Sequence, residues 1–293
     1  MADSPPIWRS QLFVPANRPQ FVAKAHTRGA DAVILDLEDS VPVAERAQAR
    51  SMLADSIAQV RRGSADVLVR VNNIGGELEQ DLAACEPNMP DALVIPKVES
   101  CRDLARISGW LSNRPTIGPV QYLVIIESAL GLLDMREIAE SDQPIVAMTL
   151  GGEDFALDVG MKPTVATLEV PMQLCLYTAR AAGLIPLGIF GSIAEYADLD
   201  EVRRNAQRAR DFGFEGAACI HPSVVPVLNQ VFSPADQEVD TARRLVEAYA
   251  AAQADGLGAI EVDGKMVDVP VALRAQRILD RHQRIAGHAK NPD

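Results

Sequence analysis

Ionisable residues stand directly after several short apolar runs of this sequence. Glu127-Ser128 follows one run and Gly151-Gly152-Glu153-Asp154 follows the next. Carboxylates near water are natural ligands of Mg²⁺ and Mn²⁺, which take one or two protein carboxylates and complete their shell with substrate and water. Glu127 and Asp154 therefore predict a divalent metal site, with Mg²⁺ as the expected ion and Mn²⁺ as its alternative.

Each of these two carboxylates also has a plain structural explanation. Acidic residues are common at the start of a helix, where they accept hydrogen bonds from backbone amides and interact favourably with the helix dipole. Taken singly, Glu127 and Asp154 leave the metal and capping interpretations open. The metal interpretation requires a fold that brings both side chains together.

A second charged group follows two earlier apolar runs, which end in Asp36-Leu37-Glu38-Asp39 and in Arg70-Val71-Asn72. The guanidinium of Arg70 is permanently cationic and forked, so it suits a substrate oxygen that gains charge in a transition state. An equally simple interpretation makes it a structural partner of the acidic cluster, because buried charges must be paired. We expect Glu38 and Asp39 to orient Arg70 or metal-bound water.

Two further features lie at the ends of apolar runs. Gly151 and Gly152 permit close approach of the backbone, so the amides at Gly152 and Glu153 are candidates for holding a substrate carboxylate. A tight turn that requires glycine explains this pair equally well. His221 ends the last run, and a lone histidine at such a position is more often structural than catalytic.

The apolar runs themselves are predicted to be parallel β-strands. Most are apolar throughout, as in strands that are covered on both faces, and segments of helical periodicity separate them. The eight predicted strands are Gln11–Pro15, Ala32–Leu37, Val67–Asn72, Ala92–Pro96, Tyr122–Ile126, Ile145–Leu150, Pro186–Phe190 and Ala217–Ile220. Eight strand–helix units predict an α/β protein with a (β/α)8 TIM barrel, whose active site lies at the carboxyl ends of the strands.

The segments between and after the strands complete this organisation. Arg102–Leu111, Gly131–Glu140 and Leu199–Phe212 carry apolar residues at the spacing of helices with one buried face. No G-x-G-x-x-G or Walker sequence occurs, which disfavours a nucleotide-cofactor enzyme.

Beyond the eighth strand, the pattern predicts a C-terminal appendage to the barrel. Ser233–Ala252 is predicted to be a helix that opens with Ser-Pro, and Ala272–His282 a last helix. Between them, Gly256–Pro270 contains Asp263-Gly264, which predicts a hairpin-like arm or lid. The predicted domains are therefore a barrel, residues 1–232, and a C-terminal region, residues 233–293.

Composition excludes several classes of partner. The 293 residues carry a formal charge of −12, which would repel a nucleic-acid backbone or an anionic membrane. The N-terminal segment has no apolar stretch of a signal peptide, and no apolar run reaches the length of a membrane span. The four cysteines form no C-x-x-C pair, which favours reduced thiols. We therefore expect a cytoplasmic protein without nucleic-acid or membrane partners.

The sequence resembles the citrate lyase β-subunit-like proteins of the HpcH/HpaI aldolase superfamily, which include malyl-CoA and citramalyl-CoA lyases. The resemblance covers nearly the whole chain. Its motifs are Arg9-Ser10 with Leu12-Phe13-Val14-Pro15, Asp36-Leu37-Glu38-Asp39-Ser40-Val41, Val69-Arg70-Val71-Asn72, Glu127-Ser128 before Gly131-Leu132, Gly152-Glu153-Asp154-Phe155, Cys219-Ile220-His221-Pro222 and Asp263-Gly264-Lys265-Met266-Val267-Asp268. One stretch, residues 188–196, departs from the Tyr-x-Asp pattern of many relatives.

The resemblance implies a metal-dependent barrel with ligands at Glu127 and Asp154 and a substrate-oxygen contact at Arg70. It implies that Phe13, Arg18 and Lys24 bind coenzyme A, whereas surface solvation is the simpler explanation of the two cations. It also implies that Asp268, on the C-terminal arm, is a catalytic acid and base in the active site of a neighbouring subunit. From the sequence alone, Asp268 is an acidic residue in a turn.

The function implied is that of a Mg²⁺-dependent lyase. The enzyme would cleave or form a carbon–carbon bond in a 3-hydroxyacyl-CoA, such as (3S)-citramalyl-CoA or malyl-CoA, to give acetyl-CoA and a 2-oxo acid. The alternatives are a citrate lyase β subunit acting on an acyl-carrier-protein thioester, a malyl-CoA thioesterase and a non-catalytic paralogue. The arm implies a homo-oligomer, a trimer or a dimer of trimers.

Overall fold

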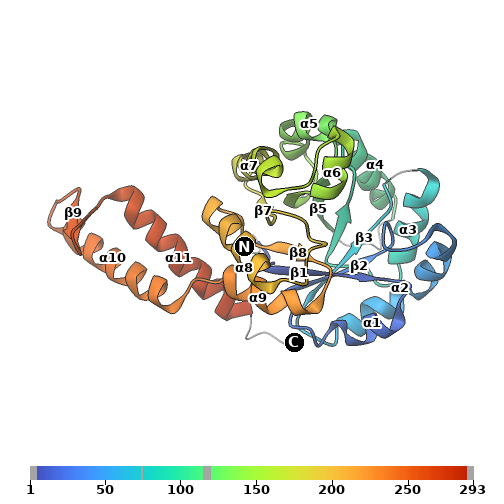
Figure 1. Cartoon of the computed structure of the whole chain (residues 1–293), viewed down its shortest axis with the longest axis horizontal. Coiled ribbons are helices and arrows are strands. Elements are labelled where there is room, and N and C mark those ends of the chain that lie inside the picture. The colour runs from blue at the N-terminus through green and yellow to red at the C-terminus, as the bar shows by residue number, and fades with distance from the viewer. Residues whose placement is uncertain (1–4, 74, 115–119, 289–293) are drawn as a thin grey trace. The chain divides into compact units, whose positions relative to one another are not determined.

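An eight-stranded parallel sheet forms the centre of the first part of the chain (Figure 1). The computed structural model describes residues 5–73, 75–114 and 120–288. The strands are β1 (Ser10–Pro15), β2 (Ala32–Asp36), β3 (Asp66–Arg70), β4 (Ala92–Ile95), β5 (Gln121–Ile126), β6 (Ile145–Leu150), β7 (Ile185–Leu187) and β8 (Ala217–Cys219). Their order in the sheet is β7-β6-β5-β4-β3-β2-β1-β8.

The sheet closes on itself into a barrel. A parallel bridge between Leu187 and Gly216 joins the end of β7 to the residue before β8. All eight predicted strands are present, so the predicted (β/α)8 fold is confirmed. The predicted strands Pro186–Phe190 and Ala217–Ile220 extend beyond β7 and β8, because the chain leaves the ladder there to line the mouth of the barrel.

Helices separate the strands in sequence. The longer ones in this part of the chain are α1 (Pro19–Ala25), α2 (Arg46–Val60), α3 (Leu78–Cys85), α4 (Cys101–Ser112), α5 (Ala129–Ala139), α6 (Gly152–Val159), α7 (Val165–Ala181), α8 (Leu199–Phe212) and α9 (Val225–Val231). The three predicted helices in this region correspond to α4, α5 and α8, and the bounds of α8 agree with the prediction. Short 3₁₀ turns occupy residues 43–45, 75–77 and 222–224.

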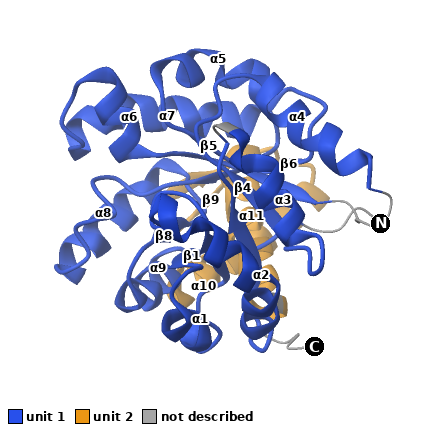
Figure 2. Ribbon diagram, turned by 90° about the vertical axis from the view of Figure 1, so that its right-hand side faces the viewer, with its two compact units in different colours: residues 1–232 blue, residues 233–293 orange. Residues whose placement is uncertain are grey.

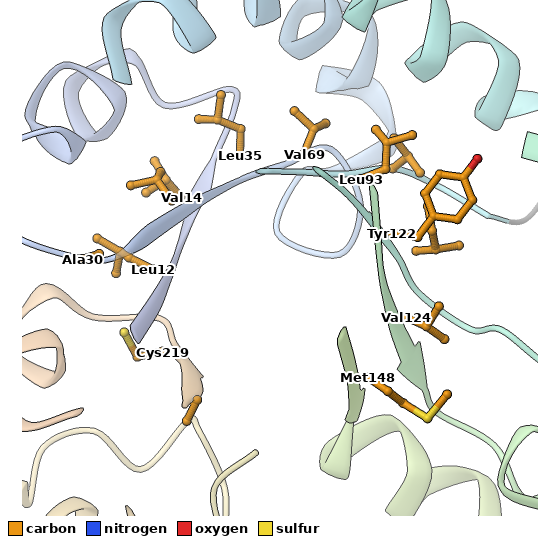
Figure 3. Close-up of a cluster of buried hydrophobic side chains, with 14 of the residues drawn as sticks. Leu12, Val14, Ala30, Leu35, Val69, Leu93, Tyr122, Val124, Met148 and Cys219 are labelled. Carbon is orange, nitrogen blue, oxygen red and sulfur yellow. The ribbon is translucent and has the colours of Figure 1, made fainter. Parts of the chain in front are cut away.

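The core has two layers because neighbouring side chains of each strand point to opposite faces. Along β2, Val33 and Leu35 belong to the cluster that includes the helices, together with the side chains drawn in Figure 3. Ala32 and Ile34 belong instead to a second cluster, which is built from strand residues and Trp8 and fills the barrel interior. Burial on both faces explains why the strands are apolar throughout.

The C-terminal unit, residues 233–293, is a second compact unit (Figure 2). It contains α10 (Asp236–Ala254), a hairpin of β9 (Ile260–Val262) and β10 (Lys265–Val267), and α11 (Val269–His288). The hairpin turns at Asp263 and Gly264, whose φ angles of 51° and 75° suit a two-residue turn of type I′. The unit thus contains the helix, hairpin and last helix of the predicted appendage.

Two predicted helix starts in this unit were wrong. Ser233 does not cap α10, because the N-cap is Ala235, whose amide donates to the Glu238 carboxylate at 2.7 Å. The last helix begins at Val269, before the predicted Ala272. Asp268 precedes it and accepts a hydrogen bond from the Val271 amide at 3.3 Å, so Pro270 lies in the first turn, where proline is tolerated.

The described helices include none that is both long and apolar enough to cross a membrane. The N-terminal segment, for which no signal peptide was predicted, lies partly outside the described residues.

Close contact at Gly216 generates a test of the barrel closure. A Cβ atom at Gly216 would lie 1.8 Å from the Trp8 carbonyl oxygen, which is a backbone atom and cannot rotate away. We expect Gly216→Ala to lower the free energy of unfolding by about 3 kcal/mol or more through overpacking. Denaturant titration measures this change. The control is Gly109→Ala in α4, where the space is open and alanine should stabilise the helix by about 1 kcal/mol.

Candidate active site

A cavity of about 180 Å³ lies at the carboxyl ends of the strands. Six of the eleven predicted site residues line it, namely Phe13, Arg70, Glu127, Gly152, Glu153 and Asp154. Of the five others, Glu38 and Asp39 contact Arg70, Arg18 and Lys24 lie exposed at α1, and Asp268 belongs to the C-terminal unit. Asp36 and Ser40 line the cavity in place of Glu38 and Asp39.

Glu127 is held inside the cavity by its neighbours. It follows β5, but the cap of the next helix is Ser128, whose hydroxyl accepts from the Gly131 amide at 3.1 Å. The Glu127 carboxylate is therefore not needed as a helix cap. Its Oε2 accepts a hydrogen bond from the backbone amide of Lys97 at 2.7 Å. A Cβ atom at Gly151, the N-cap of α6, would lie 2.6 Å from Oε1, so a larger residue at this position would displace the Glu127 side chain.

Electrostatics disfavour the charge on Glu127. Burial and the nearby Asp154 carboxylate raise its pKa to about 8. The Lys97 charge lowers this pKa, but by less than the other two effects raise it. Asp154 lies in the first turn of α6, whose N-cap Gly151 has no side chain. Glu127 follows β5 and Asp154 follows β6, and both residues line the cavity. The fold therefore brings the predicted pair together.

The residues present fit a divalent cation with oxygen ligands. Around the cavity, the acidic residues are Asp36, Glu38, Asp39, Glu127, Glu153 and Asp154, whereas Arg70 and Lys97 are the basic ones. No group of three or more His, Cys, Asp or Glu side chains in the described chain is arranged to hold a metal ion. Two carboxylates are nevertheless enough for Mg²⁺, which commonly keeps several waters. A bound cation would also offset the local excess of negative charge.

Arg70 pairs with the acidic cluster and lines the cavity at the same time. Its Nε and Nη2 atoms each lie 2.6 Å from an oxygen of the fully buried Asp36, and Nη1 lies 3.0 Å from Glu38. Its guanidinium carbon lies 4.8 Å from the centre of the Phe13 ring. Burial alone would raise the pKa of Asp36, but the bonds from Arg70 and the Ser40 hydroxyl lower it below the ordinary value. Both groups therefore stay charged.

Glu38 and Asp39 connect Arg70 to Lys97. The Lys97 ammonium forms ion pairs with Glu38 and, at 3.3 Å, with Asp39, while Asp39 also lies 3.5 Å from Nη1 of Arg70. Partial burial would lower the pKa of Lys97, but these carboxylates raise it, so the ammonium remains charged. Glu38 and Asp39 thus both contact Arg70, and their role in orienting it stays a prediction.

Lys97 lies near this site, and no role was predicted for it from the sequence. It has a φ angle of 53°, an unfavourable conformation for a residue with a Cβ atom. This backbone directs the Lys97 amide to Glu127, and its side chain reaches Glu38. The position after the fourth strand was the only available signal, because a contact made by a backbone amide leaves no trace in residue type.

The other predicted residues are placed as follows. Arg18 is the N-cap of α1 and Lys24 lies in its last turn, on either side of Phe21, which is 56% exposed. His221 is exposed and stacks on Tyr196, with ring centres 4.8 Å apart. Its Nδ1 atom lies 2.7 Å from the Ser223 hydroxyl, which agrees with a structural role.

Fold and site together define a class of protein. A closed (β/α)8 barrel with carboxylates and a paired arginine at the carboxyl ends of its strands has the architecture of a barrel enzyme. Comparison with known proteins identifies the family.

The family model described as HpcH/HpaI aldolase/citrate lyase matches residues 9–222. The chain is 31% identical over 281 residues to the citrate lyase subunit beta of Leuconostoc mesenteroides subsp. cremoris, with 92% of each chain covered. It is 32% identical over 283 residues to a (3S)-malyl-CoA thioesterase of Cereibacter sphaeroides, with 95% of this chain and 96% of that protein covered.

Among solved structures, the protein CitE from Mycobacterium tuberculosis in complex with magnesium, acetoacetate and coenzyme A superposes with a TM-score of 0.77 at 28% identity. The match covers 96% of this chain and 99% of the other. The protein therefore belongs to the HpcH/HpaI aldolase/citrate lyase family. Membership confirms the predicted resemblance and the predicted enzyme class, a carbon–carbon lyase.

The raised pKa of Glu127 predicts how a metal and protons compete. Between its ordinary value of 4.5 and about 8, the folded protein holds a proton that the unfolded chain has released. The free energy of unfolding of the metal-free protein should therefore fall as pH rises through this range. Because a ligand carboxylate must be ionised, the Kd for Mg²⁺ should rise about tenfold for each pH unit below 8 and should stay constant above pH 8.

Calorimetric titration with Mg²⁺ from pH 6 to pH 9 measures this dependence, and buffers of different ionisation enthalpy count the protons released. Glu127→Gln is the matched variant, since it keeps the shape of the side chain and should lose Mg²⁺ binding. A Kd for Mg²⁺ that does not change with pH would contradict the prediction.

Proposed function

We propose that the protein is a Mg²⁺-dependent acyl-CoA lyase that cleaves or forms a carbon–carbon bond in a 3-hydroxyacyl-CoA. Substrates such as (3S)-citramalyl-CoA or malyl-CoA would give acetyl-CoA and a 2-oxo acid. The observation that carries this proposal is the presence of Glu127, Asp154 and Arg70 around one cavity at the barrel mouth. The CitE complex with magnesium and coenzyme A supports it by similarity. A cytoplasmic location is part of the same proposal.

In the proposed mechanism, Glu127 and Asp154 hold the cation, whose chemistry is Lewis acidity toward the oxygens of the hydroxy acid. Arg70 binds the oxygen that becomes the carbonyl. Its Nη2 atom bonds Asp36 through one N–H and keeps a second for a ligand in the cavity. Asp36 and Glu38 fix the guanidinium before substrate arrives, so little reorganisation is needed when charge develops.

The amides of Gly152 and Glu153, in the first turn of α6, are proposed to bind the substrate carboxylate. They are N-terminal amides of a helix, whose N–H groups lack partners within the helix and favour anions. Phe13 lines the cavity, whereas Arg18 and Lys24 lie exposed at α1, which directly follows β1. These two cations are proposed to bind the phosphates of coenzyme A, for which a protein of strongly negative net charge needs a local basic site.

Asp268 is proposed to exchange the proton of the acetyl group. It is partly exposed, between the hairpin and α11, and accepts one hydrogen bond from the Val271 amide. In cleavage, the hydroxyl proton passes to water as the carbonyl forms, and Asp268 protonates the departing thioester enolate and regains a proton from water. In the reverse direction Asp268 removes a methyl proton as general base, and water protonates the alkoxide. We propose that it acts in the site of a neighbouring subunit of a homotrimer or a dimer of trimers.

Two relatives favour specific alternatives. Similarity to citrate lyase subunit beta supports action on an acyl-carrier-protein thioester within a larger complex. Similarity to (3S)-malyl-CoA thioesterase supports hydrolysis, which would release malate and free coenzyme A without a 2-oxo acid. Both alternatives use the same cavity and differ in their products.

A product assay distinguishes these activities. The protein is incubated with malyl-CoA, methylmalyl-CoA and citramalyl-CoA and Mg²⁺, and 2-oxo acid, acetyl- or propionyl-CoA and free coenzyme A are each quantified. We expect 2-oxo acid and acyl-CoA in equal amounts and no turnover after chelation of the metal. Free coenzyme A without 2-oxo acid would support the thioesterase, and turnover only of carrier-protein thioesters would support the citrate lyase subunit.

Complementation between inactive variants tests the role of Asp268 across subunits. Asp268→Asn and Glu127→Gln should each lower kcat by at least about 100-fold, and Asp268→Asn should leave the Kd for Mg²⁺ unchanged. If each site combines the barrel of one subunit with the arm of another, random mixing restores about a quarter of the sites. Activity is measured after the variants are mixed under conditions of subunit exchange, with each variant alone as control. No recovery in an exchanged oligomer would contradict the proposal.

A further inference from the structure

The cavity has an apolar wall that the proposed mechanism does not use. The acidic side comes from the ends of β2, β5 and the start of α6. The apolar wall is formed by Leu168 and Met172 of α7 and by Ile189 and Ile193, which follow β7. Two of these side chains thus belong to the segment after β7 and two to the helix before it.

The wall lies close to the candidate cation site. A Cβ atom at Gly152 would lie 3.1 Å from Cδ1 of Leu168, so Leu168 packs against the first turn of α6, which also carries Asp154. On the other side, a Cβ atom at Gly188 would lie 3.0 Å from Cε of Met172. Leu168 and Met172 are 1% and 4% exposed, so they are packed among their neighbours and leave little surface open to the cavity.

No free cation is available for a second substrate carboxylate. Among the described residues that line the cavity, Arg70 is the only basic one. It is paired with Asp36 and Glu38, and its remaining Nη2 N–H is proposed to bind the oxygen that becomes the carbonyl. The uncharged polar side chains of the lining are the hydroxyls of Ser40, Thr149 and Ser192, which carry no charge to balance a second carboxylate. A carboxylate placed against the apolar wall would lose water and would face an excess of acidic residues. The same surface favours an uncharged alkyl group.

We propose that this wall determines specificity and selects substrates whose 2-oxo acid portion has one carboxylate and an alkyl substituent. The inference rests on the proposed function and deepens it. The carboxylate and hydroxyl of the substrate occupy the cation side, and the thioester leaves through the mouth because its carrier is far larger than the cavity. The remaining substituent of the carbinol carbon then packs on the apolar wall. A second carboxylate at this position is rejected.

Binding of 2-oxo acids tests this inference without turnover. Glyoxylate, pyruvate, 2-oxobutyrate and oxaloacetate are titrated into the full-length protein with saturating Mg²⁺, and Kd is measured by calorimetry. We expect pyruvate and 2-oxobutyrate to bind at least about tenfold more tightly than glyoxylate or oxaloacetate, because each buried alkyl group adds apolar contact. If oxaloacetate binds as tightly as pyruvate, the inference about the wall is overturned while the proposed function stands. Failure of all four to bind overturns the proposed function and the inference with it.

Variants of the wall provide a second measurement. Ile193, which is 37% exposed, can be replaced without burying a charge, and Ile193→Arg should improve the Kd for oxaloacetate relative to pyruvate by about tenfold. The control is Leu133→Arg on α5, which is 80% exposed, does not line the cavity and should leave this ratio unchanged. Leu168→Ala should shift preference from pyruvate toward 2-oxobutyrate. Unchanged ratios in both wall variants, with the fold intact by circular dichroism, overturn the assignment of the wall.

Discussion

The buried carboxylate of Glu127 is the constraint around which the active site is arranged. Removing a carboxylate from water is costly unless a partner is supplied, and Asp154 adds repulsion to that cost. The backbone amide of Lys97 donates a hydrogen bond to Glu127 at 2.7 Å, and this contact requires a positive φ angle at Lys97, a residue with a side chain. Backbone strain and an unfavourable buried charge occur together at functional sites. A cation bound by Glu127 and Asp154, as proposed, would offset the repulsion between their carboxylates.

In the ion-pair network next to Glu127, by contrast, each charged side chain has a partner of opposite charge. Arg70 is satisfied by Asp36 and Glu38, and Lys97 by Glu38 and Asp39, so these charges are compensated without any ligand. Lys97 belongs to both parts, because its amide holds Glu127 and its ammonium holds Glu38. Lys97 thereby connects Glu127, a proposed metal ligand, to the ion pairs of the Arg70 guanidinium.

Local patterns in the sequence were enough to predict the strands, the barrel and the gathering of charged residues at its mouth. Each parallel strand is buried on both faces, so its apolar run and its polar end are visible in the sequence. The capping interpretation of Glu127 was wrong, because Ser128 supplies the cap itself, whereas metal ligation by Glu127 stays a prediction. The Lys97 amide and the apolar wall could not be predicted, since they depend on a backbone conformation and on packing between α7 and the segment after β7.

The state of each carboxylate around the cavity limits which of them can transfer a proton. Asp36 is held ionised by Arg70 and Ser40, and Glu127 and Asp154 are proposed to be metal ligands, so none of the three can donate and accept protons in turn. Glu153 is exposed beside the cavity in the first turn of α6, and the proposed mechanism uses its backbone amide for the substrate carboxylate. The proposed use of Asp268 therefore separates proton transfer from the strongly charged barrel mouth. A carboxylate on a separate unit can approach the acetyl group without being tied to Arg70 or to the cation.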